Sequence, residues 1–249
     1  LTGVGFKPKV LISFGTGQTA TGAATDAFMH YGFSDGTTDR CTSVFSDDAV
    51  VSSSECRRRH SDAVIDQVDT GQATLMKAAI STLDTDGATF TVFDFPSIAT
   101  LMGYVAIGGD DFTNVSIDDI SAPSGTGNQS YTGPGFQPDA IVLMSVAMSP
   151  AVPGSTSNLL YSIGWATSVA DQAASGISSK QTTTPSDTDR FQLTDSCLAL
   201  PWDGSGRHQI KLVSFDSTGY TLNHVSTNGD EKIFVLALKG GQSKAMSQA

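Results

Sequence analysis

Residues 2–8 of the chain read TGVGFKP, and residues 132–138 read TGPGFQP. Gly5 and Gly135 occupy the same place in the two stretches, so the offset between the copies is 135 − 5 = 130. An apolar run follows each copy, VLISF at 10–14 and AIVLM at 140–144. A self-match at a long, fixed period indicates that one structural unit is written twice in the chain.

Further segments repeat in the same order downstream. HYGF at 30–33 matches SIGW at 162–165, and TLDTDGATF at 82–90 matches SFDSTGYTL at 214–222, both at an offset of 132. Each copy closes on a β-type run that ends in two glycines. We therefore predict two homologous domains, 1–120 and 131–241, joined by a flexible linker at 121–130 and followed by a polar tail at 242–249.

Composition favours an all-β chain. Among the 249 residues there are 23 Asp but only two Glu, and Thr and turn-forming residues are abundant. Good helix formers are scarce, so we expect one helical turn at most, near 24–29. The sequence predicts two tandem homologous β-sandwich domains of jelly-roll type, with Asp-Gly hairpins. In this prediction Phe6 and Phe136 fill equivalent buried sites.

Charge excludes several classes of partner. The formal charge is 14 − 25 = −11 and the pI is about 4.5, which argues against nucleic-acid binding. No apolar run approaches the ~20 residues of a membrane span, so no membrane partner is expected. The chain begins with Leu1 and carries no signal-peptide pattern, so we expect a processed, trimmed or incomplete N-terminus.

Metal and cofactor motifs are weak. The three cysteines Cys41, Cys56 and Cys197 fit neither a disulfide framework nor a CxxC zinc site. The glycine-rich stretch GTGQTATG at 15–22 lacks the spacing of a phosphate-binding loop, which favours a surface loop. DTDG at 84–87 resembles the start of a calcium loop, but the second copy reads DSTG at 216–219 and has lost a carboxylate. We expect hairpin turns, with no metal and no cofactor.

Catalytic patterns are equally sparse. None of the four histidines lies in a recognisable nucleophile motif, and GxSxG is absent, so surface or turn positions are expected for them. A carboxylate pair for glycoside hydrolysis could be present among 23 Asp, although the near absence of Glu counts against it. We predict no catalytic residues.

Two features stand out as candidate partner contacts. Arg57, Arg58 and Arg59 form the one basic cluster of an acidic chain. They fit either a solvated strand edge that blocks aggregation or a docking site for acidic partner surfaces. Trp202 precedes the loop DGSG at 203–206 and is the best aromatic candidate for a sugar contact.

The two TGxGFxP openings, the segment 214–222 and the closing LALKGG at 236–241 resemble a pattern in virion structural proteins of tailed bacteriophages. The resemblance implies concanavalin-like or jelly-roll sandwiches, single or in tandem. It also implies a non-enzymatic capsid decoration (cement) protein on the outer surface of the particle. Its expected partners are the major capsid or tail proteins of the same virion, and self-association is open.

Two alternatives remain open at this point. The first is a receptor-facing tail or head-fibre module that binds host surface glycans, with Trp202 and its loop as the contact. The second is a glycan-active enzyme on a sandwich fold, which would need two carboxylates converging in a groove.

Overall fold

The computed structural model describes residues 1–23, 25–47, 56–68, 74–95, 100–148, 152, 154–181, 187–202, 205–227 and 229–241. These residues form antiparallel sheets and contain no helix, which confirms the all-β fold class. The helical turn expected near 24–29 is wrong, because strand β2 begins at Ala27. Within the described residues, no helix with the length and apolarity of a bilayer span is found.

Contacts divide the chain into two compact units, and each is described by itself. Unit 1 contains Leu1–Asp110 together with two short segments from later in the chain, Ala151–Leu159 and Ser179–Ser186. Unit 2 contains Asp111–Pro150, Leu160–Ser178 and Asp187–Ala249. The division falls at Asp110, ten residues before the expected domain end at 120, so 111–120 goes with unit 2.

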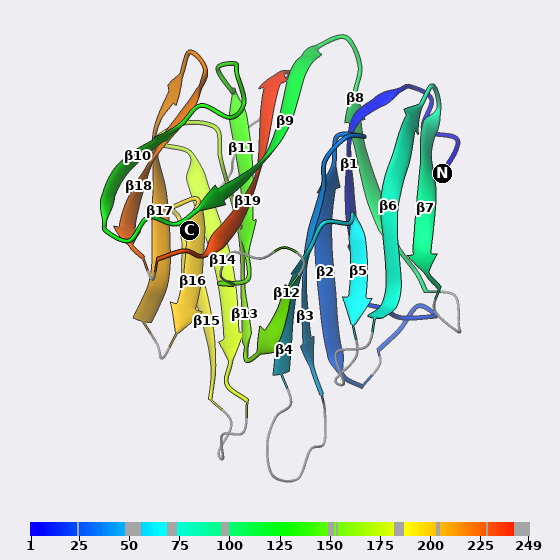
Figure 1. Cartoon of the computed structure of the whole chain (residues 1–249), viewed down its shortest axis with the longest axis horizontal. Helices are drawn as coiled ribbons and strands as arrows, with labels where there is room; N and C mark the ends of the chain where they lie inside the picture. The colour runs from blue at the N-terminus through cyan, green and yellow to red at the C-terminus, as the bar shows by residue number, and fades with distance from the viewer. Residues whose placement is uncertain are drawn as a thin grey trace. The chain divides into compact units, whose positions relative to one another are not determined.

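Unit 1 has a six-stranded sheet in the order β12-β4-β3-β2-β1-β8 and a three-stranded sheet in the order β5-β6-β7 (Figure 1). Strands β1 to β4 are a meander, and β8 returns to pair with β1. This order is simpler than the two Greek keys of a jelly roll. The strands are β1 (Pro8–Gly15), β2 (Ala27–Ser34), β3 (Asp39–Ser46), β4 (Cys56–Ser61), β5 (Ile65–Val68), β6 (Thr74–Asp84), β7 (Gly87–Asp94), β8 (Gly103–Gly108) and β12 (Gly154–Ser157).

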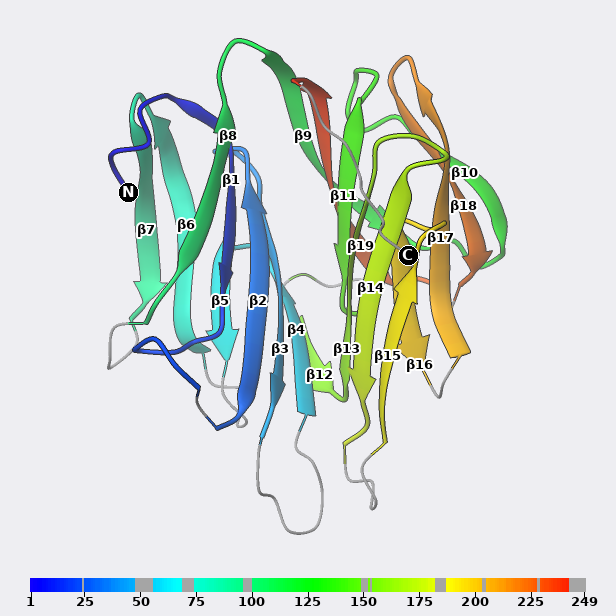
Figure 2. The same cartoon turned by 180° about the vertical axis from the view of Figure 1, so that it is seen from behind.

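Unit 2 has a six-stranded sheet in the order β15-β14-β13-β11-β19-β9 and a four-stranded sheet in the order β10-β18-β17-β16 (Figure 2). Here too the later strand β19 returns beside the first strand of the repeat, β11. The strands are β9 (Phe112–Ser121), β10 (Gly127–Tyr131), β11 (Ala140–Ser145), β13 (Leu159–Ala166), β14 (Gln172–Ser179), β15 (Thr188–Leu193), β16 (Leu198–Trp202), β17 (Ser205–Asp216), β18 (Gly219–Ser226) and β19 (Lys232–Gly240).

Part of the expected linker is a strand. Gly127–Tyr131 forms β10 and pairs along β18, with Gly127 opposite His224 and Tyr131 opposite Tyr220. A linker at 121–130 is therefore wrong for this segment. Its Ser, Gly and Asn content is typical of a loop, but pairing with β18 overrides local propensity.

The strand registers reproduce the repeat. In unit 1 Ser13 lies opposite Gly32, and in unit 2 Leu143 lies opposite Gly164. In the hairpins, Asp84 pairs with Gly87 and Asp216 with Gly219. The repeated segments therefore occupy equivalent places in the two units, and β1, β2, β6, β7 and β8 correspond to β11, β13, β17, β18 and β19.

Each unit packs its two sheets around a core. In unit 1 the buried cluster includes Leu11 from the larger sheet and Ile65 and Ile80 from the smaller one. In unit 2 a larger cluster joins both sheets through side chains such as Leu143 and Tyr220. This two-layer packing is that of a β-sandwich.

The expected burial of the two repeat phenylalanines is wrong. Phe6 is 37% exposed, and Phe136 is partly buried against the unit 2 core. The opening motif is instead held by backbone geometry, since Gly5 and Gly135 have φ of +81° and +71°. Glycine adopts this left-handed region without strain.

The Asp-Gly hairpins are held by their first aspartate. Asp84 accepts hydrogen bonds from the hydroxyls of Thr82 and Thr89, both at 2.7 Å. Asp216 does the same with Ser214 and Thr221, also at 2.7 Å. These bonds lower the pKa of both carboxyls.

Candidate functional site

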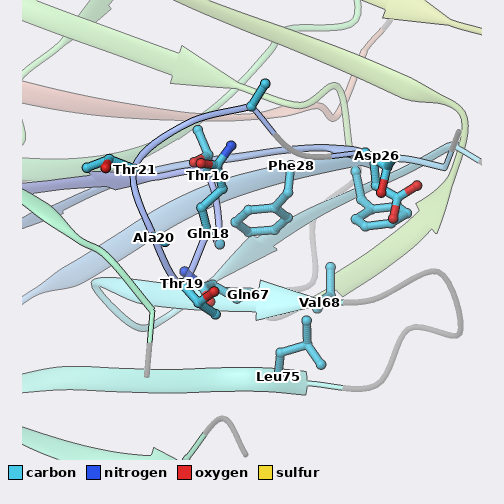
Figure 3. Close-up of a pocket in the computed structure, with 14 residues that line it drawn as sticks. Thr16, Gln18, Thr19, Ala20, Thr21, Asp26, Phe28, Gln67, Val68 and Leu75 are labelled. Carbon is cyan, nitrogen blue, oxygen red and sulfur yellow. The ribbon is translucent and has the colours of Figure 1, made fainter. Parts of the chain in front are cut away.

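Unit 1 contains a pocket of about 380 Å³. The connection between β1 and β2 forms one wall and contributes Thr16, Thr19, Thr21 and Asp26 (Figure 3). The other walls come from strands β2, β3, β5 and β6, with Phe28, Phe45, Gln67, Val68 and Leu75. A hollow that combines an aromatic ring, aliphatic side chains and several hydroxyls suits a small polar ligand.

The glycine-rich stretch predicted as a surface loop is this wall. Gly17 has a φ of +70°, and a Cβ there would lie 3.3 Å from the Phe28 ring. In the orientation that suits its neighbours, the Gln18 amide donates to the carbonyls of Ala20 and Gly22 at 3.1 and 3.0 Å. The loop is therefore closed by its own bonds and rests on Phe28.

Two polar side chains in the lining could recognise a ligand. Gln67 is 1% exposed, and its Oε1 accepts no hydrogen bond within the described structure. Asp26 is the one carboxylate among the described lining residues. Retaining and inverting glycosidases both need a carboxylate pair, and the described lining residues contain a single carboxylate.

His30 lies close to the pocket on β2, and its ring centroid is 6.1 Å from that of Phe28. It is fully buried, and an interaction with the backbone of Gly15 offsets the effect of burial only in part. Burial lowers its pKa to about 4. The ring is therefore neutral in the folded protein at pH 7. Its burial disagrees with the surface or turn position that the sequence predicts.

Stability should consequently fall on mild acidification. An unfolded histidine binds a proton below about pH 6.5, whereas His30 in the folded state does so only near pH 4. The stabilisation is thus present above pH 6.5 and is lost as pH falls towards 4. From pH 7 to pH 5 we expect His30 to account for about 2 kcal/mol of lost unfolding free energy.

The measurement is denaturant unfolding at both pH values for the wild type and His30→Gln. His224, which titrates in the same window, contributes equally to both proteins and cancels in the comparison. A pH dependence that is identical in the two proteins would contradict the assignment.

Unit 2 contains a buried polar chain that links four side chains. Glu231 Oε2 lies 3.2 Å from His208 Nδ1, and His208 Nε2 lies 3.0 Å from His224 Nδ1. His224 Nε2 lies 2.9 Å from the Tyr131 hydroxyl. Burial and the neighbouring His208 lower the pKa of His224 to about 4.

The histidine positions correct the sequence-based expectation. His30, His60, His208 and His224 are all at most 1% exposed, so none is a surface or turn residue. The equivalents of His208, His224 and Glu231 in unit 1 are Met76, Val92 and Thr100, by the registers of β6, β7 and β8. The polar chain is therefore specific to unit 2. It links the side chains of neighbouring strands inside that unit.

The arginine cluster does not lie on a sheet edge. It occupies β4, which is paired on one side with β3 and on the other with β12, so an edge-protecting role is wrong. Arg58 is 8% exposed, and its Nη1 donates to the Asn158 carbonyl at 3.2 Å. Arg59 Nε lies 3.0 Å from the buried carboxylate of Asp66. The guanidinium groups of Arg58 and Arg59 therefore make contacts within unit 1.

Trp202 is the last residue of β16 and pairs in register with Ser205. It therefore ends a strand instead of lying in a loop, and residues 203–204 of the expected contact loop lie outside the described residues. Trp202 belongs to unit 2 and the arginines belong to unit 1.

All three cysteines of the chain are buried. Burial raises the pKa of Cys197 to about 12 and that of Cys41 well above its usual value. No group of three or more His, Cys, Asp or Glu side chains among these residues is placed to hold a metal ion.

No family model, curated protein or solved structure matches the chain.

The pocket residues Phe28, Gln67 and Asp26 were missed by sequence reasoning. They are up to 41 residues apart in sequence (67 − 26 = 41), and the packing of one sheet of unit 1 on the other brings Gln67 on β5 to the same pocket as Phe28 on β2. The one local signal was the run of threonines and glycines at 15–22, which by itself is also typical of an ordinary surface loop.

Proposed function

We propose that this chain is a non-enzymatic structural protein of a tailed-phage virion. It decorates the outer surface of the capsid and bridges neighbouring subunits, with the major capsid or tail proteins as its partners. The proposal follows from the sequence resemblance, and one feature of the surface supports it most strongly.

That feature is the uneven distribution of exposed apolar side chains. Of the eleven exposed large hydrophobic residues in the described chain, eight belong to unit 1 and three to unit 2. Phe93 and Phe95, two positions apart at the end of β7, are 64% and 74% exposed. Exposed aromatic side chains that are neighbours, as positions i and i+2 of an extended segment are, are typical of a surface that contacts another protein. Unit 1 is thus the half that we expect to attach to the particle.

Particle location is the direct test. Purified virions should contain the chain at a fixed copy number, and stripping it should lower the temperature at which the heads release DNA. Recovery of the chain from infected-cell cytosol and never from particles would refute the proposal.

Attachment should depend on the two phenylalanines more than on the arginines. We expect the Phe93→Ser/Phe95→Ser variant to bind stripped particles at least ten times more weakly than the wild type. Val169→Ser, which removes a 58% exposed side chain from unit 2, is the matched control and should bind normally. Arg57→Ser tests whether the arginine cluster contributes to attachment. Arg58 and Arg59 are left in place, because they also stabilise unit 1.

A second candidate function is glycan binding by the unit 1 pocket. It is favoured by the Phe28 ring, the threonine hydroxyls and the Gln67 amide that line this hollow. Glycan recognition would make the chain a receptor-facing module of a tail or head fibre.

A glycan array tests this alternative. Binding that is lost in Phe28→Leu and retained in Trp202→Ala would support the pocket, whereas loss only in Trp202→Ala would support the β16–β17 end. An array without any binding, together with normal host adsorption of both variants, would remove the alternative.

A further inference from the structure

The pocket of unit 1 lies where the second repeat has core leucines. Phe28 on β2 lines the pocket (Figure 3), whereas its equivalent in unit 2, Leu160 on β13, is fully buried in the core cluster. By the registers of β5 on β6 and of β16 on β17, the equivalent of Gln67 is Leu200, which is also a fully buried core residue. The first repeat therefore has an aromatic ring and an amide where the second has two leucines that fill its core.

The Gln67 amide lowers stability at such a position unless its polar atoms are satisfied. The side chain is 1% exposed, and its Nε2 donates to the Met102 Sδ at 3.4 Å. No hydrogen-bond partner is found for its Oε1 within the described structure. Buried polar atoms without a hydrogen bond are rare, because each one lowers the free energy of unfolding. The buried Oε1 therefore points to a ligand that donates a hydrogen bond to it.

The polar side chains of the described lining need donors from a ligand. Gln67 Oε1 and the Asp26 carboxylate are acceptors only, and the threonine hydroxyls can act either way. The Gln18 amide donates to the carbonyls of Ala20 and Gly22 in the orientation that suits its neighbours, so its donors are already engaged. A ligand rich in N–H or O–H groups therefore matches this lining better than one rich in acceptors.

The charge of the lining favours a cation among the possible donors. Asp26 is the one charged side chain among the described lining residues, which include no Lys, Arg or His. The whole chain has a formal charge of −11, so its field attracts cations and repels anions. Phe28 and Phe45 line the same pocket, and aromatic rings attract cations that lie over their faces. An ammonium group combines hydrogen-bond donors with positive charge, whereas carboxylate, sulfate and phosphate groups have neither.

We propose that the unit 1 pocket binds a sugar-sized ligand that carries a free ammonium group, as in an unacetylated amino sugar. The Asp26 carboxylate attracts the ammonium group, a ligand donor binds to Gln67 Oε1, and the ring of the ligand packs on Phe28. A volume of about 380 Å³ is at the small end of the range for ligand pockets, which suits a small saccharide. The inference rests on the second candidate function, glycan binding by this pocket, and names the class of its ligand.

Four probes with the same pyranose ring and different charges test the ligand class. They are glucosamine, glucose, N-acetylglucosamine and glucuronate, and their dissociation constants are measured by NMR titration at about pH 6 and low salt. We expect glucosamine to bind at least threefold more tightly than the two neutral sugars and at least tenfold more tightly than glucuronate. The first ratio is modest because Asp26 is exposed, and added salt should lower it.

A pair of charge-matched variants tests the part of Asp26. Asp26→Asn should abolish the preference, so that glucosamine and glucose bind with equal affinity. Asp110→Asn makes the same change in net charge at an exposed position outside the described lining, and it should keep the threefold preference.

Gln67→Leu tests the buried acceptor, because it introduces the residue that unit 2 has at this place. We expect glucosamine and glucose to bind at least ten times more weakly to this variant. Its free energy of unfolding should equal or exceed that of the wild type, since a buried amide with an unsatisfied oxygen is removed. The stability measurement separates loss of a ligand contact from loss of the fold.

Three outcomes would overturn the inference. Equal affinity of the wild type for glucosamine and glucose, or a preference that persists in Asp26→Asn, would exclude an ammonium site and leave glycan binding in place. Unchanged affinity in Gln67→Leu would place the sugars outside this pocket. Failure of all four probes to bind would overturn the ligand class as well. None of these measurements involves particles, so failure of the inference is distinguishable from failure of the capsid proposal.

Discussion

Replacing Gly164 by alanine is expected to destabilise unit 2 by at least about 3 kcal/mol. A Cβ at this position would lie 2.3 Å from the Cys197 carbonyl oxygen and 2.7 Å from that of Ala173. Both atoms are backbone, so the new methyl group can be accommodated only if a strand moves. The glycine is therefore needed for close packing, and its φ lies outside the left-handed region.

Gly32 provides the same test in unit 1. Its added Cβ would lie 2.0 Å from the Val64 carbonyl oxygen, so Gly32→Ala should cost a similar amount. Gly125 is the matched control, because nothing lies within 4 Å of its added Cβ and its φ is also outside the left-handed region. We expect Gly125→Ala to change the unfolding free energy by less than about 1 kcal/mol. The unfolding free energies of the three variants, measured in denaturant, test this prediction. Equally small losses in all three would contradict a packing role for Gly32 and Gly164.

Removal of the Glu231 carboxylate should be nearly as damaging. Glu231 is 2% exposed and is the hydrogen-bond partner of the fully buried His208 Nδ1. Glu231→Ala leaves this nitrogen without its partner and creates a cavity, and we expect a loss of about 3 kcal/mol.

The first repeat supplies the compensating variant. Unit 1 has Met76, Val92 and Thr100 where unit 2 has the three polar residues, and Thr100 Oγ1 lies 3.8 Å from Met76 Sδ. The triple variant His208→Met/His224→Val/Glu231→Thr replaces three of the four members of the buried chain with groups that need few hydrogen bonds and leaves Tyr131 in place. It should be more stable than Glu231→Ala by more than 1 kcal/mol, as expected for strongly coupled sites. Additive losses in urea unfolding would show that the three residues act independently.

Much of the fold could be predicted from the repeated segments. The Asp-Gly hairpins and the first strands of each copy lie where the sequence predicts them, because turn chemistry and apolar runs are local signals. The repeated glycines at 32 and 164 were visible as matches. Their role depends on the carbonyl groups of Val64 and Cys197, which lie more than thirty residues further along the chain, and a local pattern does not show this.

The failures have a common physical cause. Strand β10 has a loop-like composition and becomes a strand through pairing with β18. His208 was expected at the surface because its side chain is polar. It is buried instead, and its hydrogen-bond partner Glu231 lies 23 residues away in sequence. Phe6 is apolar and repeated, yet it remains 37% exposed in a unit whose described sheets lack counterparts of β9 and β10. In each case tertiary pairing decides the outcome, and the sequence within a few residues carries no record of it.

Strand β12 has a consequence for the order of folding during synthesis. It extends the larger sheet of unit 1 beside β4, yet it comes from the β11–β13 connection of the second repeat. Residue 157 leaves the ribosome 157 − 110 = 47 residues after Asp110 closes the first part of unit 1. Strand β4 is therefore a temporary edge of the first unit while residues 131–157, about a quarter of the next repeat, are made. Contacts of such long sequence separation slow folding and prolong the exposure of unpaired strands. A nascent chain halted before residue 154 should consequently be the species most in need of a chaperone.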